Sequence, residues 1–212
     1  MDSAKVILTT EDPNLNEVLS LTEAIGTEGQ LDHKQNLRLR LLAEELVGML
    51  RGIAGDVSAV YKLERLGKKY LLSLTSDVTM TRSMREQLIF ASKTGKNSVA
   101  LGFMGKIKEM IAVALLPDDE DISPIEGLSL GLMGMSSPGG AVETGALPNV
   151  SQWSMDSYKE ALNSESISKE ESREAWDELE RSITASIADD VRVSVTGSHV
   201  EIVIEKDFSK DE

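Results

Sequence analysis

The sequence of 212 residues contains no cysteine, and His33 and His199 are its only histidines. The lack of cysteine excludes disulfide bonds, thiol nucleophiles and thiolate metal sites, and two histidines poorly supply a histidine-rich metal site or a Ser-His triad. No uncharged apolar run approaches the roughly 18 residues of a membrane-spanning helix. Residues 1–5 also lack the basic start and apolar core of a signal peptide. We therefore expect a cytoplasmic protein without a membrane partner.

Basic residues are few, with 22 Lys and Arg against 36 Asp and Glu, which gives a formal net charge of −14. This balance argues against nucleic acid as a partner, because neutralising phosphates needs clustered Lys and Arg. A hydrophobic fraction of 41% with 27% charged residues is typical of a globular protein. The length predicts a single domain over residues 1–212 that carries one large insertion.

The spacing of apolar residues predicts two hairpins and several helices. Alternation over residues 57–75 and 191–204, with Gly67 and Gly197 in the connections, is typical of antiparallel hairpins. Apolar residues three or four apart predict helices elsewhere. The expected helices cover residues 12–26, 32–54, 81–93, 98–116, 154–162 and 168–187, and a further strand covers residues 5–9. We expect an α+β two-layer sandwich, with a largely antiparallel sheet covered on one face by helices. No internal repeat is visible.

A change of composition marks the insertion, which we place at about residues 117–150. Six glycines fall within residues 127–145, beside Met133 and Met135. Glycine at that density opposes regular structure because it raises the entropy lost on ordering. We therefore expect a long loop, of a length that is uncommon unless the loop is functional or disordered.

Three short motifs offer candidate site residues, each beside an ordinary explanation. Glu44 and its neighbour Glu45 lie in the predicted helix 32–54, where paired acids usually form a solvated edge, although a carboxylate at the margin of a pocket could act as a general base. Asp77 ends a predicted strand, as a cap or as an acceptor for an exocyclic amine such as that of adenine. Gly102 and Gly105 allow close approach of a helix or of a phosphate, and helix packing is the favoured explanation.

Taken in order, these features resemble the GHKL (Bergerat-fold) ATPase and kinase superfamily, especially its anti-sigma-factor serine-kinase branch. Residues 41–50 resemble its first helix, residues 57–76 its hairpin, and residues 187–206 its closing helix end and strands. The resemblance implies a Bergerat-like fold, Glu44 as general base, Asp77 as the adenine-binding aspartate, and Gly102 with Gly105 as a remnant of the second glycine motif. It also implies ATP or ADP as the cofactor.

The sequence departs from this family at the residues that carry the chemistry. The family places a magnesium-binding Asn four residues after its Glu, where this chain has Gly48 after Glu44, or Met49 after Glu45. Neither side chain can supply an amide oxygen. Residues 78–81 also lack the glycines that follow the family's aspartate. These departures argue against magnesium binding, and no metal ligand is assigned.

Three hypotheses follow. The first is a catalytically degenerate GHKL-like regulatory protein that binds nucleotide weakly or not at all and acts on an unidentified protein partner. The second is a divergent active ATP-binding enzyme, a serine-kinase-like protein or an ATPase, in which Glu44 is the base, Asp77 holds adenine and residues 127–145 close as a lid. The third is an interaction or assembly module without a ligand. A homodimer is compatible with all three. We favour the first.

Overall fold

The computed structural model describes residues 2–9, 14–53, 58–78, 107, 111, 150–163 and 169–211. Its architecture is α+β, with one six-stranded antiparallel sheet in the order β1-β2-β3-β6-β5-β4. The strands are β1 (Asp2–Thr9), β2 (Ser58–Leu66), β3 (Lys69–Asp77), β4 (Val150–Ser154), β5 (Asp190–Thr196) and β6 (His199–Asp207). Both predicted hairpins, β2–β3 and β5–β6, are confirmed.

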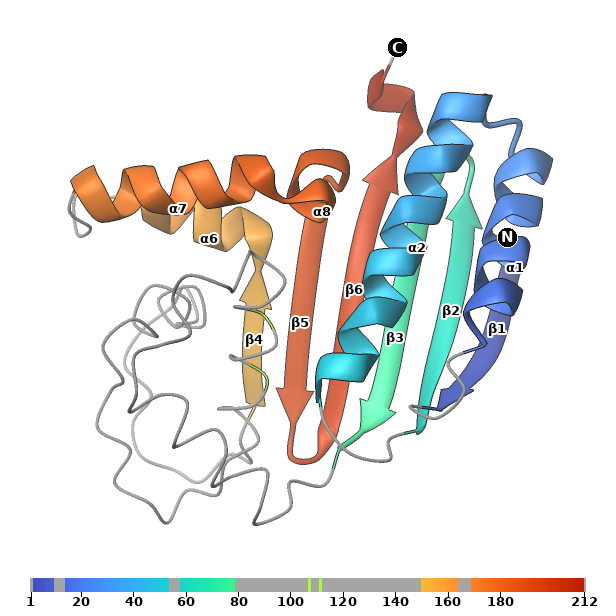
Figure 1. Ribbon diagram of the computed structural model, residues 1–212, viewed down its shortest axis with the longest axis horizontal. Helices are drawn as coiled ribbons and strands as arrows, with labels where there is room; N and C mark the ends of the chain where they lie inside the picture. The colour runs from blue at the N-terminus through green and yellow to red at the C-terminus, as the bar shows by residue number, and fades with distance from the viewer. Residues whose placement is uncertain are drawn as a thin grey trace.

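The described helices are α1 (Leu15–Glu28), α2 (His33–Ile53), α6 (Met155–Leu162), α7 (Lys169–Arg181), α8 (Ile183–Ile187) and the 3-10 turn η1 (Phe208–Asp211). Figure 1 shows α1 and α2 in front of the sheet, running roughly along its strands, whereas α6, α7 and α8 gather toward the side where β4 lies. Helix α1 contacts β1 and β2, α2 contacts β3 and β6, and α6 contacts β4 and β5. Ile107 and Ile111 are helical and buried, which agrees with the helix predicted over residues 98–116.

Alternation along the strands separates a buried face of the sheet from a less buried one. Burial in β2, β3, β5 and β6 repeats every second residue, as expected when successive side chains point to opposite faces. One row of directly opposed buried residues crosses the whole sheet. It consists of Val6, Tyr61, Leu74, Ile202, Val193 and Trp153. The core therefore lies on this face, and we call the opposite one the open face.

The chain order of the elements repeats, although the sequence shows no repeat. A strand, a set of helices and a hairpin form β1-α1-α2-β2-β3, and the same order returns from β4 to β6. The two units meet at β3 and β6. Gly197 follows Gly67 by 130 positions, and both have positive φ in their hairpin turns. The sheet is thus built from two similarly ordered halves joined side by side.

The structure corrects several predicted boundaries. Helix α1 continues past Gly26 to Glu28 and is capped by Gly29, whose backbone N–H donates to the Ile25 carbonyl. Gly26 is instead buried against Asn36 of α2. The helix predicted over residues 168–187 breaks at Ser182, whose hydroxyl accepts a hydrogen bond from the backbone N–H of Ala185. This break leaves Ile183 exposed, although it follows the buried Leu179 at helical spacing. Strand β4 was not predicted.

All three tyrosines of the chain are buried, and burial raises the pKa of each phenol. Tyr61 donates a hydrogen bond to the hydroxyl of Thr22, which itself donates to the Val18 carbonyl. Burial raises the pKa of Tyr70, and this effect outweighs the positive charge of Arg65, which lowers the pKa. Burial, with a smaller contribution from the charge of Glu178, raises the pKa of Tyr158 to about 12.

We expect alkaline pH to destabilise the fold through these phenols. A tyrosine in the unfolded chain ionises at about pH 10. A tyrosine with a raised pKa in the native protein therefore contributes its full stability below that pH, and this contribution is lost as the pH rises through the native pKa. Each tyrosine lowers the free energy of unfolding by about 1.4 kcal/mol per pH unit in that window. Urea unfolding at stepped alkaline pH should therefore show that the free energy of unfolding falls less steeply with pH for Tyr61→Phe than for the wild type. Ionisation of all three phenols in the native protein near pH ~10, read from absorbance, would contradict this expectation.

Candidate functional site

The predicted general base Glu44 lies on the exposed side of α2. Leu42 and Leu46, which bracket it in the sequence, are fully buried, whereas Glu44 is exposed and Glu45 is half-buried. Gly48, one turn further on, is also exposed, and a Cβ atom there would meet nothing within 4 Å. Glu44 and Gly48 therefore share a face of α2 that points away from the buried core.

Asp77 ends β3 on the open face of the sheet. Its neighbour Ser76 is buried and donates a hydrogen bond to the Ser58 carbonyl, so alternation turns Asp77 the other way. The Asp77 carboxylate lies 3.0 Å from Nδ1 of His199, the residue directly opposite in β6. Both side chains are more than half exposed. The arrangement is a surface pair across the two strands.

The structure therefore does not bring Glu44 and Asp77 into one site. Glu44 belongs to a helix that contacts β3 and β6 on the buried face, while Asp77 belongs to the alternate set on the open face. Gly102, Gly105 and most of the loop predicted at about residues 117–150 lie outside the described residues, whereas Val150, the last residue of that range, begins β4. Within the described ranges, no three His, Asp or Glu side chains gather closely enough to hold a metal ion. None of the described helices is long and apolar enough to cross a bilayer.

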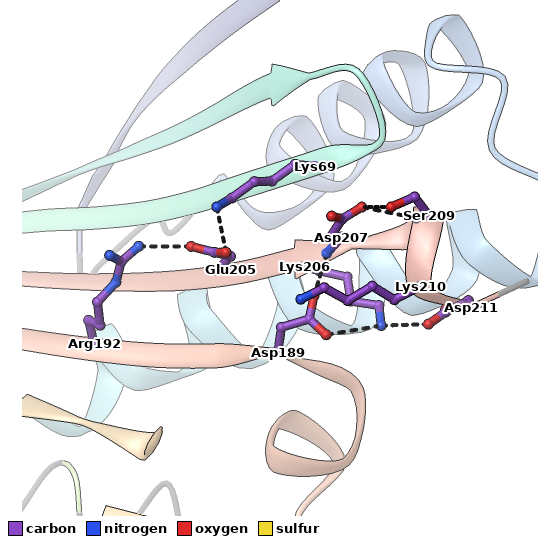
Figure 2. A network of polar contacts seen from close by, with 9 residues as sticks. All are labelled: Lys69, Asp189, Arg192, Glu205, Lys206, Asp207, Ser209, Lys210 and Asp211. Carbon is purple, nitrogen blue, oxygen red and sulfur yellow. Dashed lines mark hydrogen bonds and ion pairs between the residues drawn. The ribbon is translucent and has the colours of Figure 1, made fainter. Parts of the chain in front are cut away.

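Charged side chains on the open face form a network that the sequence did not predict. Glu205 of β6 lies between Lys69 of β3 and Arg192 of β5, and its carboxylate pairs with both (Figure 2). Arg192 also lies 3.7 Å from the carboxylate of Asp190. The three strands are thus tied together by ion pairs on this face. The sequence shows these charged residues at alternate positions of the strands. Which of them form ion pairs depends on the order of the strands in the sheet.

A second cluster surrounds the buried ammonium group of Lys206 at the end of β6. Its Nζ donates to Oδ1 of Asp211 at 2.7 Å and lies 3.7 Å from Asp189 (Figure 2). Arg38 of α2 binds the other oxygen of Asp211 at 2.7 Å, and the Lys206 ammonium lies 5.5 Å from the centre of the Phe208 ring. We call these five residues the C-terminal clasp, because they join α2, β6, η1 and the residue before β5.

The pKa values of two carboxyl groups reflect these contacts. Burial raises the pKa of Asp211, but the hydrogen bonds and charges of Lys206 and Arg38 outweigh it and hold the pKa below its ordinary value. Hydrogen bonds from the hydroxyl and backbone of Ser209 lower the pKa of Asp207. A lowered pKa contributes stability above the pKa of the unfolded chain, and this contribution is lost as the pH falls. The clasp therefore fits a structural role.

The corner of the open face formed by β1 and β2 carries an exposed apolar residue and two lysines that lie directly opposite each other. Ile7 is 66% exposed and lies directly opposite Val60. Lys5 is exposed and lies directly opposite Lys62, which is already paired with Glu64 at 2.9 Å. Among the described residues, no carboxylate lies within ion-pair distance of Lys5. We call Lys5, Ile7, Val60 and Lys62 the β1 corner.

In comparisons with known proteins, no protein family, no individual protein and no solved structure matches this chain.

Proposed function

We propose that this chain is a regulatory protein that acts through contact with a protein partner, and that the partner binds at the β1 corner. The proposal includes a two-layer, Bergerat-like arrangement with degenerate nucleotide motifs. It thus combines the predicted GHKL resemblance with a binding surface that the sequence did not identify.

The observation that supports a protein partner is the combination of an exposed Ile7 with two lysines directly opposite each other. Like charges opposite each other on neighbouring strands are destabilising, and a nearby carboxylate relieves that repulsion. Elsewhere on this face, Lys69 and Arg192 have acidic partners. At the β1 corner, Lys62 has Glu64 and Lys5 has no acid among the described residues. A partner that presents an apolar and an acidic side chain together would complement this surface.

Weak or absent nucleotide binding is the other part of the proposal. It is supported by the positions of Glu44 and Asp77, which belong to different sides of the sheet. A ligand that binds only the folded state raises the melting temperature. We expect ADP and ATP to leave the melting temperature unchanged with or without magnesium. A large magnesium-dependent rise would favour the alternative of an active ATP-binding enzyme.

The partner surface can be tested with a display library of random peptides selected on the wild-type protein. Enriched peptides should combine apolar and acidic residues, and Ile7→Lys should abolish their binding. Leu37→Lys is the matched control, because Leu37 is 50% exposed but lies on α2. The proposal would be overturned if the peptides bound Ile7→Lys as well as the wild type, or if Leu37→Lys abolished their binding equally. A selection that enriches no peptide would also overturn it.

A further inference from the structure

We propose that β1 binds its partner by strand addition: an extended, acidic strand of another protein pairs antiparallel with the outer edge of β1. This inference rests on the proposed function and specifies how the β1 corner is used. Strand β1 is the outermost strand on its side of the sheet (Figure 1). All eight of its residues pair with β2 in one unbroken register, and none of the described strands pairs with its outer side.

The backbone of β1 sets which groups would bind. The carbonyl of Ile7 accepts a long hydrogen bond, 3.5 Å, from the side-chain amide of Asn14, so this carbonyl points away from β2. In an antiparallel strand, the N–H and C=O of one residue point to the same side, and the side alternates along the strand. Ser3, Lys5 and Ile7 therefore direct their backbone groups outward, while Ala4 and Val6 bond to β2. The amide of Asn14 lies where the N–H of an added strand would lie.

The absence of blocking features supports this use of the edge. Proteins commonly protect an edge strand with proline, a bulge or short length. Residues 2–9 contain no proline, the register has no bulge, and the strand is eight residues long. Lys5 is the single basic residue of β1, and a lysine is itself a common guard against aggregation. An acidic residue of an incoming strand would neutralise the charge of Lys5, which makes the edge selective for acidic strands.

The side chains of the β1 corner define the partner's sequence pattern. An antiparallel strand would place an apolar residue opposite Ile7 and, two residues later, an acidic residue opposite Lys5. The residue between them would lie on the same side as Val6, which is 5% exposed, and should therefore be apolar. The recognised pattern is apolar, apolar, acidic in the direction of the partner chain.

A capped peptide, Ser-Thr-Val-Val-Glu-Thr-Ser, provides the probe, with a matched peptide in which lysine replaces glutamate. The glutamate peptide should bind the wild-type protein more tightly. Lys5→Glu should weaken the glutamate peptide about fivefold and strengthen the lysine peptide, because a cross-strand attraction becomes a repulsion. Lys5 makes no described ion pair, so the variant should fold normally. Equal affinity of both peptides for the wild type would overturn the assigned role of Lys5.

Backbone pairing is tested separately with Ile7→Pro and Ile7→Val. Proline is tolerated on an edge strand where its nitrogen faces outward. Because Ile7→Pro removes the backbone N–H and the apolar contact, it should weaken binding of the glutamate peptide about tenfold. Ile7→Val should bind like the wild type. Hydrogen exchange on the wild type needs no variant: the peptide should protect the amides of Lys5 and Ile7, while those of Ala4 and Val6 are already protected.

These outcomes distinguish the two proposals. Peptide binding that Ile7→Lys abolishes, without protection of the Lys5 and Ile7 amides, would overturn strand addition and leave the β1 corner as a side-chain binding surface. Failure of the library selection would overturn both proposals. A dimer of the wild-type protein that Ile7→Pro converts to a monomer would show that a second copy occupies this edge, which also overturns the partner strand.

Discussion

Gly29→Ala is expected to destabilise the fold by about 3 kcal/mol, the upper part of the range for overpacking a core. Gly29 caps the C-terminal end of α1, and a Cβ atom there would clash with the hydroxyl oxygen of Tyr70 and lie 3.2 Å from the Ile25 carbonyl oxygen. The Tyr70 side chain is fully buried and stacks edge-on against Phe208, so it cannot move aside freely. Urea unfolding should measure the loss directly.

Gly48→Ala is the matched control. Gly48 is an exposed residue inside α2, and a Cβ atom there would meet nothing within 4 Å. Replacing a glycine in a helix interior with alanine removes an entropic penalty, so we expect a gain of about 0.5 to 1 kcal/mol. The same chemical change should thus have opposite signs at the two sites.

A second substitution identifies the atom responsible. Tyr70→Phe removes the hydroxyl that the new Cβ atom would meet, and the next contact, at 3.0 Å, is to the flexible side chain of Arg65. In the Gly29→Ala background, Tyr70→Phe should therefore recover part of the lost stability. Additive effects in this double-mutant cycle would show that the two groups do not clash.

Lys206→Met is the second substitution with a large expected effect, a loss of about 3 kcal/mol. The Lys206 side chain has only 7% exposure, and its ammonium group lies 2.7 Å from Asp211. The change keeps most of the apolar stem but removes this ammonium group. Breaking a buried ion pair leaves its partners with poorly compensated charge. Here, among the described residues, Asp211 would keep only Arg38, and Asp189 would keep only Lys210 at 3.7 Å. Thermal or urea unfolding at neutral pH should show the loss.

Lys69→Met provides the comparison for the C-terminal clasp. Lys69 also pairs with an acid, Glu205, but its side chain is 39% exposed on the open face. Exposed ion pairs are worth about 0 to 1 kcal/mol, so this variant should remain within about 0.5 kcal/mol of the wild type. Equal effects of the two substitutions would mean that burial does not distinguish these lysines.

Much of the local structure was predictable because it depends on short-range spacing. The residues of β2, β3, β5 and β6 alternate with period two, and glycines stand in both turns, so the hairpins follow from the sequence. Helix α2 was predicted within one residue at each end. The candidate site was less predictable, since residue type placed Glu44 and Asp77 on a helix and at a strand end but not relative to one another.

Strand β4 and the broken helix after Arg181 show why local patterns were insufficient. Strand β4 has only five residues, of which Trp153 belongs to the buried row through its pairing with Val193 of β5. Its identity as a strand depends on a partner about forty residues later. The break at Ser182 depends on a capping hydrogen bond that competes with continued helix.

The sequence by itself determined the class of fold, the hairpins and the long amphipathic helices, because hydrophobic periodicity and turn glycines act within a few residues. Tertiary structure alone decided which distant residues meet. It paired Asp77 with His199, placed Lys206 among Asp189, Asp211 and Phe208, and left Lys5 and Ile7 at an outer edge. The order of strands in a sheet follows from the burial of the whole core, and no local pattern contains it.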